Sequence, residues 1–444
     1  MSSLPTAGPL DAAVGKVFRR VVPLFVVMLI CNQLNRSNIG YAQEHLEADV
    51  GIGAAAYGLG AGLFFIAYAI FELPSNMLME RYGPKIWLTR IMVSWGLVSA
   101  AMAFVQGPTS FYVLRFLLGA AEAGFFPAII YFFSRWLPSS HRGRATALFV
   151  AGSSIAAAVS GPLSGPLLSL HGFLGAAGWQ WLFGLEGLLS VVVGLIAYTR
   201  LDSRIADAKW LSGPEQNALV AAIEQEDEAR RFTAASGSVS RWRLLVQPQI
   251  LVFCVIYFAI QLSIYANTFW LPNIIRRIEG TNDITVGLLS SLPWICAVVA
   301  MYFTGRASDK LGRSKPLLIG ALVVAAAGTY LAAVVSPVLA LVFLCVAAMG
   351  FKSASPLFWT IPQGSVHPLA LASAVAIINS LGNLGGFVAP YGFGLIKEAT
   401  GEVTWGLYAL AAACLVAAVL VLFLRRDRVV APPVTLRETV GEKS

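Results

Sequence analysis

Apolar stretches of about 20 residues, the length that a bilayer demands, recur twelve times along this chain of 444 residues. Most are apolar all round rather than along one stripe, as expected of membrane-spanning helices. The predicted spans are 18–43, 57–78, 86–105, 111–134, 144–170, 178–199, 248–272, 284–304, 316–335, 338–361, 370–396 and 403–424. The only long polar segment, 200–247, is predicted to be a linker with a short surface helix. The pattern predicts an all-α polytopic membrane protein with twelve transmembrane helices.

The twelve spans divide into two similar halves, 1–199 and 248–444, on either side of the 200–247 linker. At an offset of 229 residues, matching residue types recur at matching places: Asn38 with Asn267, Glu80 with Asp309, Gly83 with Gly312, and Pro127 with Pro356. Such coincidences indicate duplication of a six-helix unit. Two parallel six-helix halves are a transporter architecture, with the substrate site near the membrane midplane between them.

Composition supports the membrane assignment, because 57% of residues are hydrophobic and only 12% are charged, against about 25% charged in soluble domains. No nucleotide-binding glycine loop occurs, and the cysteines and histidines show no metal-site spacing. We therefore expect no cofactor and no metal, and the net charge of +8 is no sign of nucleic acid. Of the 31 Lys and Arg, 25 lie in one alternating set of polar segments, including both termini and the linker. This bias predicts a multi-pass protein of the cell inner membrane with both termini cytoplasmic; a monomer is expected.

Three cations interrupt the predicted spans: Arg36, Arg115 and Lys352. A charge at membrane depth costs roughly 3 kcal/mol or more on insertion scales and persists where it faces a protein interior or a water-filled cavity. Glu122 is the clearest acid at similar depth. A membrane interior with surplus positive charge predicts a binding site for an anion.

Two loops resemble the cytoplasmic signature of the major facilitator superfamily: GRASDKLGRSK at 305–315 and its counterpart MERYGPK at 79–85. Gly305 and Gly312 are expected to allow tight turns, and Asp309 could pair with an arginine or cap a helix. Such pairs could latch the halves in one state and break in another. The predicted gating residues are Glu80, Arg81, Gly83, Gly305, Asp309, Gly312 and Arg313.

A finer resemblance runs through the first half, in LNRSNIGYA (34–42), FELPSNMLMERYGPKIW (71–87), RFLLGAAEAGFFPAIIYFFSRW (115–136), SGPLSGPLL (160–168) and GWQWLFGLEGL (178–188). These segments are similar to the anion:cation symporters, which move sugar acids, tartrate, aromatic acids and related carboxylates, usually with protons. The resemblance implies that Arg36 and Tyr68 contact substrate and that Glu122 couples transport to protons. That family usually has Asp before the first-helix Arg, where this chain has Asn35. An anion exchanger, a uniporter or an exporter without proton coupling therefore remains an alternative.

Further candidates come from the residues themselves. Arg115 and Glu122 are seven apart and share one helix face, and Gly119 between them is expected to leave that face open. Lys352 could hold the second carboxylate of a diacid or reach an interface. Polar and aromatic lining from the second half is expected from Tyr265, Trp359, Asn379 and Asn383, whereas Glu186 is interpreted as structural. An enzyme is disfavoured because no catalytic set occurs at depth; a receptor signalling through the linker is the other alternative.

Overall fold

The computed structural model describes residues 8–234, 247–312, 314–366 and 368–424, and all regular elements there are helical. Twelve membrane-length segments follow one another in the chain. The first half contains α2 (Val22–Val50), α3 (Ala54–Tyr82), α4 (Pro84–Ala101), the pair α5 (Pro108–Glu122) and α6 (Phe125–Trp136), α7 (Ser139–Leu168) and α8 (Gly178–Arg200). The second contains α11 (Pro248–Ile275), α12 (Asp283–Leu311), α13 (Ser314–Val334), α14 (Pro337–Ser365), the pair α15 (Pro368–Asn383) and α16 (Gly385–Thr400), and α17 (Thr404–Phe423).

The predicted twelve-helix fold is confirmed. Ten helical segments of the described chain are long and apolar enough to cross a membrane. The other two spans are α2, whose apolar run is diluted by polar residues such as Asn32, Asn35 and Arg36, and the interrupted pair α15–α16. Both the polar first span and the interrupted eleventh span therefore border the space between the halves.

The first span differs from its predicted bounds of 18–43. The short helix α1 (Pro9–Arg20) precedes it, and α2 continues to Val50 before Gly51, at φ 68°, ends it in the left-handed conformation. That conformation suits glycine because it has no Cβ. The polar residues 43–49 thus extend the helix beyond its apolar part.

The fourth span is broken in the middle, which the apolar pattern did not predict. Ala123 leaves the helix and Gly124 takes φ +87°, so that α5 ends at Glu122 and α6 begins at Phe125. The freed carbonyl of Ala123 accepts a 2.6 Å hydrogen bond from the Ser75 hydroxyl, which accepts one from the Trp87 indole at 3.0 Å. A break at membrane depth is tolerated because its backbone groups find such partners.

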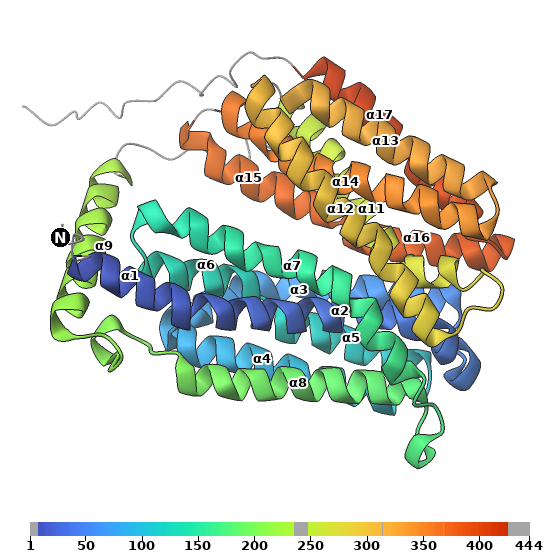
Figure 1. Ribbon diagram of the computed structural model, residues 1–444, viewed down its shortest axis with the longest axis horizontal. Helices are drawn as coiled ribbons and strands as arrows, with labels where there is room; N and C mark the ends of the chain where they lie inside the picture. Colours follow the sequence, from blue (N-terminus) through green and yellow to red (C-terminus); the bar gives the residue numbers. More distant parts are fainter. Residues whose placement is uncertain (1–7, 235–246, 313, 367, 425–444) are drawn as a thin grey trace, which may run out of the picture.

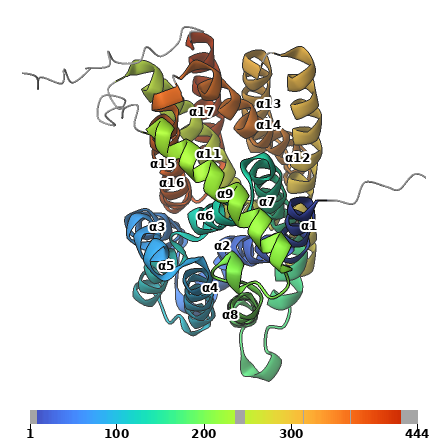
Figure 2. The same cartoon turned by 90° about the vertical axis from the view of Figure 1, so that its left-hand side faces the viewer.

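The two six-helix halves lie side by side, and α9 (Gly213–Ala234) crosses one end of the bundle near α1 (Figures 1 and 2). We call this end the α9 end. At the opposite end the halves touch along two seams, α3 with α16 and α7 with α12. A Cβ on Gly58 would lie 2.4 Å from the Pro390 carbonyl oxygen, and one on Gly161 would lie 2.0 Å from that of Gly287. We call this tightly packed end the closed end.

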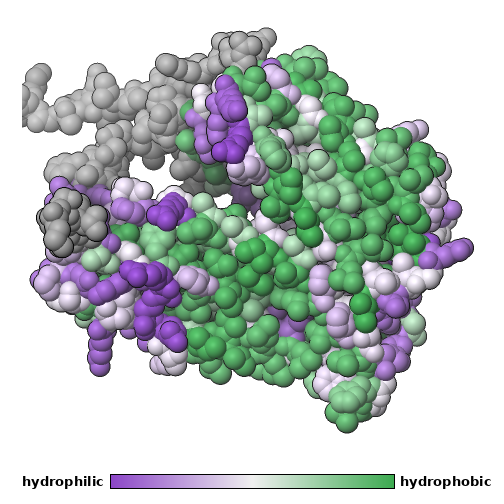
Figure 3. Space-filling model, in the orientation of Figure 1, coloured by the Kyte–Doolittle hydropathy of each residue, from purple (hydrophilic) through white to green (hydrophobic). Residues whose placement is uncertain are grey.

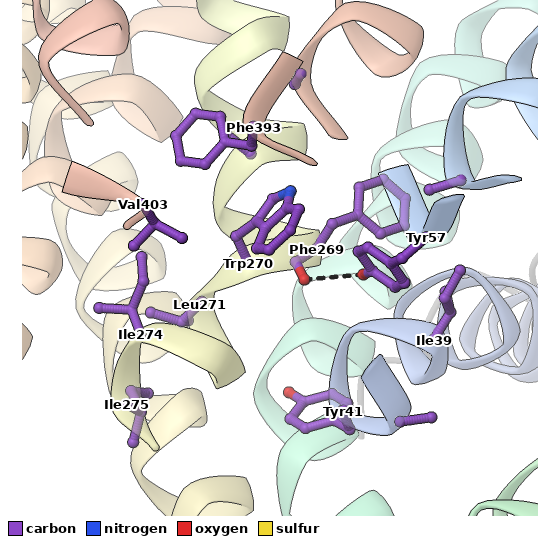
Figure 4. Packing of buried hydrophobic residues seen from close by; sticks show 14 of the residues in the cluster. Ile39, Tyr41, Tyr57, Phe269, Trp270, Leu271, Ile274, Ile275, Phe393 and Val403 are labelled. Carbon is purple, nitrogen blue, oxygen red and sulfur yellow. Dashed lines mark hydrogen bonds between the residues drawn. The ribbon is translucent and has the colours of Figure 1, made fainter. Parts of the chain in front are cut away.

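Aromatic side chains fill the centre of the closed end (Figure 4). The Tyr57 hydroxyl of α3 donates a 3.0 Å hydrogen bond to the carbonyl oxygen of Phe269 in α11 (Figure 4), which ties the two halves together. The Tyr57 ring also meets Trp270 edge to face at a centroid distance of 5.3 Å. Such aromatic pairs add about 0.5–1.5 kcal/mol each beyond the area they bury.

The surface shows the division expected of a membrane protein. Hydrophobic side chains cover the middle of the molecule, hydrophilic ones gather at the two ends, and a hollow separates the halves toward the α9 end (Figure 3). Large apolar side chains such as Leu73 and Phe303 are mostly exposed on this belt. Lipid tails, rather than water, are the natural environment for such a continuous apolar surface.

The predicted linker contains a docked helix rather than only a solvated connector. Lys16 of α1 forms a 2.7 Å ion pair with Glu215 of α9, and Arg142 of α7 forms a 2.9 Å pair with Glu226. The hydrogen bond from Lys16, together with that from the Ser212 backbone, lowers the pKa of the Glu215 carboxyl. The described part of the linker is therefore attached to the first half. The segment 235–246 of that linker lies outside the described residues.

Candidate functional site

A cavity between the halves is formed by two connected parts that share Arg36, Phe65, Ser153 and Tyr265. Its inner part has a volume of about 320 Å³ and is lined mainly by α2, α7, α11 and α14. The outer part has a volume of about 720 Å³ and is lined by α2, α3, α6 and α15. Both halves therefore contribute to one space, and Arg36 lies where its two parts meet.

Arg36 is paired with Glu122. Its Nε donates to Glu122 Oε1 at 2.5 Å, and a second guanidinium nitrogen contacts the same oxygen. The other carboxylate oxygen, Oε2, is buried without a hydrogen-bond partner. The guanidinium carbon also lies 5.2 Å from the ring centroids of both Phe64 and Tyr68. An ion pair that engages one of two carboxylate oxygens leaves the other free to take a proton.

Arg115 is a correction to the prediction. Its side chain is buried in the first half and lines neither part of the cavity. Its Nε donates a long 3.4 Å hydrogen bond to the Gly60 carbonyl, and its guanidinium lies 5.1 Å from the Phe64 ring. Among the described residues no ion pair joins Arg115 to Glu122. Gly119, expected to leave an open face, instead packs against α3, since its Cβ would lie 2.1 Å from the Phe64 carbonyl oxygen.

Lys352 of α14 lines the inner part of the cavity, across the interface between the halves from Arg36. Its ammonium lies 5.1 Å from the ring centroid of Trp294. In the described part of the chain it forms no hydrogen bond or ion pair. A cation that faces a cavity over an aromatic ring, without an acid of its own, can accept a carboxylate from a ligand.

Most of the predicted lining residues do face the cavity. Tyr265 borders both parts and packs against Phe65 at a centroid distance of 4.6 Å. Tyr68, Asn379 and Asn383 border the outer part. The side-chain oxygen of Asn383 is already engaged, because it accepts a 2.9 Å hydrogen bond from Gln261.

Trp359 is a second correction, because it borders neither part of the cavity. It packs edge to face on Tyr257 of α11, with ring centroids 4.8 Å apart. Trp359 lies two turns along α14 from Lys352, at a position where α14 packs against α11.

Several polar groups of the cavity were missed by sequence reasoning. Glu72 of α3 borders the outer part, so this acid shares the cavity with Arg36, whereas Glu122 borders neither part. Ser37 and Ser160 border the inner part and share a 2.7 Å hydrogen bond between their hydroxyls. If Glu72 and Glu122 are both ionised, they balance Arg36 and Lys352. The predicted surplus of positive charge therefore depends on protonation of an acid.

Asn35, the departure from the family pattern, does not border the cavity. Its amide nitrogen donates to Cys31 O at 2.8 Å and to Ser190 Oγ at 2.9 Å, and its side-chain oxygen accepts from Ser99. The side chain thus joins α2 to α4 and α8. An aspartate would lack the two donors, which is a physical reason for an amide at this position.

The predicted latch residues lie at the α9 end. Gly83 ends α3 at φ 83° and Gly312 ends α12 at φ 59°, as a tight turn requires. Gly305 is a correction, because it lies inside α12 and makes no turn. Glu80 and Asp309 form no ion pair among the described residues, and Arg81 lies over the Tyr82 ring at 5.6 Å. Arg313 is outside the described residues.

Sequence reasoning also missed a polar cluster that joins the halves at the closed end. Arg276 donates to Asp283 at 2.5 Å and lies 3.4 Å from Glu44, while the His45 ring lies 3.0 Å from Asp283. The Asn273 amide donates to Glu44 at 2.8 Å. The only sequence signal was the polar end of the first span. Because Glu44 and His45 come from the first half and the others from the second, opening this end requires that these contacts break.

Known proteins resemble this chain in both sequence and fold. The sequence profile of the Major Facilitator Superfamily matches residues 25–390 and 253–442. The chain belongs to the major facilitator superfamily. Its helical halves superimpose on the crystal structure of a D-xylose-proton symporter with a TM-score of 0.74 at 13% identity, covering 92% of this chain and 98% of that one.

Two curated relatives of this major facilitator protein are named as transporters. It is 40% identical to the "Putative tartrate transporter" of Agrobacterium vitis, covering 93% of this chain and 91% of the relative. It is 41% identical to the "Quinolone resistance transporter" of Acinetobacter baumannii, covering 88% and 90%. The chain is therefore a multi-pass membrane transporter, not an enzyme, and the expected resemblance to organic-anion transporters of this superfamily is confirmed.

Proposed function

We propose that this protein is a secondary transporter that imports a small organic carboxylate across the inner membrane by alternating access, coupled to protons. The observation on which the proposal rests is the cavity between the halves, bordered by Arg36 from one half and Lys352 from the other. Guanidinium binds carboxylate in a bidentate fashion. The tartrate relative supports a carboxylate as the substrate class.

The Arg36–Glu122 pair suggests how a proton and a substrate are coupled. A substrate carboxylate and Glu122 compete for the same guanidinium, because Glu122 Oε1 occupies two of its nitrogens. Proton binding at the free Oε2 removes the charge of Glu122 and releases Arg36 for the substrate. It also removes the counter-charge of Arg36, so that the cavity becomes more attractive to an anion. Proton and anion would thus bind together and leave together, which is symport.

The hollow toward the α9 end fits a state that is open to one side and closed at the other. The bias of Lys and Arg toward segments at the α9 end assigns that side to the cytoplasm. We therefore assign this structure to the inward-facing state. In the outward-facing state, Arg276 and Asp283 would separate from Glu44 and His45 at the closed end, and the signature loops at the α9 end would approach each other.

Transport into proteoliposomes tests the carboxylate and its coupling. With an inward proton gradient, the wild type should accumulate a carboxylate such as tartrate above its external concentration. Glu122→Gln should lower this accumulation but retain exchange of internal for external substrate, which needs no net proton movement. Glu224→Gln, on the exposed face of α9, is the matched control. Accumulation that is unchanged in Glu122→Gln would refute coupling through this residue.

Lys352 provides a test of the substrate class. Tartrate and threonate have the same carbon chain, but only tartrate has a second carboxylate. A hydrogen bond to a charged group contributes about 1.5–3 kcal/mol, so Lys352→Met should weaken tartrate binding about 10- to 150-fold and threonate binding far less. Equal losses for both acids would show that Lys352 does not hold a second carboxylate.

Export is a second candidate, because the quinolone-resistance relative is as similar as the tartrate relative. Quinolones are themselves aromatic carboxylic acids, so the same guanidinium could bind them. Inside-out and right-side-out vesicles with opposite proton gradients separate the two. Uptake of a quinolone into inside-out vesicles alone would favour proton-driven export.

A further inference from the structure

Glu186 lies near the middle of the first half, on α8, outside both parts of the cavity. The residue is 5% exposed. One carboxyl oxygen, Oε2, accepts a 2.9 Å hydrogen bond from the Asn38 amide. The other, Oε1, is buried and has no hydrogen-bond partner. Neither Arg36 nor Glu122 contacts it, so the coupling described above makes no use of this group.

The surroundings of Glu186 contain no charged group among the described residues. From α2 it is faced by Cys31, Asn38 and Tyr41, and from α7 by Ser164. From α4, Ser99 reaches only the Asn35 amide beside it. The titratable neighbours are thus a thiol and a phenol, both neutral at physiological pH. In the part of the chain that the structure describes, no lysine, arginine or histidine forms an ion pair with it.

An ionised carboxylate at such a place is costly. Burying a charge without a counter-ion costs several kcal/mol even after the protein relaxes, and one amide hydrogen bond compensates only part of that. A neutral carboxylic acid avoids the charge and gains a donor. Ser164 Oγ lies beside Glu186 and is also buried without a hydrogen-bond partner. If Oε1 carried a proton and donated it to Ser164 Oγ, this one hydrogen bond would give both Glu186 Oε1 and Ser164 Oγ a partner.

A row of hydroxyl groups runs from Ser164, beside this carboxyl, to Ser160 and Tyr41 at the cavity wall, although Ser164 forms no hydrogen bond with the other two in this state. Ser37 and Ser160 share a 2.7 Å hydrogen bond at the cavity wall. Tyr41 also borders the cavity, and its hydroxyl lies beside Ser160. Ser164 follows Ser160 by four residues on α7, so the two occupy the same helix face. Hydroxyls both donate and accept, and a row of them can relay a proton.

We propose that Glu186 is a second proton-binding site of this transporter, which exchanges its proton with the cavity through Ser164, Tyr41 and Ser160. In the step, a proton from cavity water binds one oxygen of the carboxylate, which becomes a neutral acid, and release reverses the step. This inference rests on the proposed function for its role in transport, but not for the protonation itself.

The position of the row also links it to the conformational change. Tyr41 lies beside Ser290 of α12 as well as Ser160 of α7. These helices form the closed-end seam, where Gly161 meets the Gly287 backbone. When α12 moves away from α7, Ser290 leaves Tyr41, and the phenol becomes free to turn. The route between Glu186 and the cavity therefore differs between the two states.

Infrared difference spectra of the reconstituted protein test the site without any substrate. The wild type at neutral pH should show the carbonyl stretch of a buried carboxylic acid that Glu186→Gln lacks, and this band should decline as pH rises. Ser164→Ala should shift the band and its titration midpoint, which keeps the test valid if Glu186→Gln fails to fold. A band that is absent from the wild type at every pH, or unaffected by either variant, would overturn the proposal.

Proton-to-substrate stoichiometry then tests its role. The wild type should move one more proton per carboxylate than Glu186→Gln, and Glu122→Gln should lose a proton independently. An unchanged ratio in Glu186→Gln would refute the role of Glu186 in coupling. If the wild type transports no carboxylate, the proposed function fails, whereas the infrared result still decides whether Glu186 is a proton site.

Discussion

The seam between α7 and α12 offers a sharp test of how the halves are held at the closed end. A Cβ on Gly161 would lie 2.0 Å from the Gly287 carbonyl oxygen, 2.8 Å from its carbonyl carbon and 3.1 Å from the Tyr41 hydroxyl. Two of these atoms are backbone, so a rotamer change cannot relieve the clash. The helices must separate, and Gly161→Ala should therefore destabilise the state described here.

The size of the effect follows from the cost of overpacking. Inserting a methyl group into a tightly packed contact costs about 1–3 kcal/mol. Because the outward-facing state separates α7 from α12, this cost applies to one state only. The equilibrium between the states should then shift toward the outward-facing one by about 5- to 150-fold. Gly184→Ala on α8 is the matched control, because nothing lies within 4 Å of its Cβ.

Electron–electron distance measurements on the reconstituted protein report the shift. Spin labels at His171 and Glu279, exposed residues in the loops that follow α7 and precede α12, read the separation of the closed end. Gly161→Ala should increase the population at the longer distance, and Gly184→Ala should match the parent. A folded Gly161→Ala with an unchanged distance distribution would refute the argument that this glycine contact holds the state. An equal shift in Gly184→Ala would refute its specificity.

Two further predictions concern the contribution of ion pairs to stability. Arg36→Met should lower the melting temperature, because removing one partner of a buried pair costs about 3–5 kcal/mol, and adding Glu122→Gln should restore most of the lost stability. Arg115→Met should lower the melting temperature far less, since no acid of the described chain pairs with Arg115. Equal melting temperatures for the two single variants would contradict the importance of the Arg36–Glu122 pair. Because the Glu215 pKa is lowered in the folded protein by Lys16, its contribution is present above the unfolded value of about 4.3 and is lost as pH falls through the lowered pKa. Protection of the α9 amides, taken as the exchange rate relative to the intrinsic rate at each pH, should thus fall in acid in the wild type and already at neutral pH in Lys16→Ala. Protection that is the same at every pH and in this variant would refute the tether.

The sequence alone was sufficient for the class of protein and for its twelve spans, because hydrophobic length reports directly on the bilayer. It also placed Arg36 and Lys352 correctly at the central cavity, since a charge that persists in an apolar helix must face an interior or a cavity. The duplication of the halves stays a prediction, which rests on glycine, proline and buried polar residues because these have few substitutes. The sequence did not predict the breaks within the fourth and eleventh spans, because the apolar pattern continues through both.

Only the tertiary structure decided which groups meet. Helical spacing places Arg115 and Glu122 on one face of α5, yet it does not say which neighbouring helix that face meets. In the folded protein Glu122 meets Arg36 of α2, while Arg115 is packed beside Phe64. Glu186 looks like an ordinary helix residue in the sequence, and its lack of a counter-ion is visible only once α2, α4 and α7 surround it. Burial and partnership are properties of the packed helices, so the chemistry of these acids could not be derived from the order of the residues.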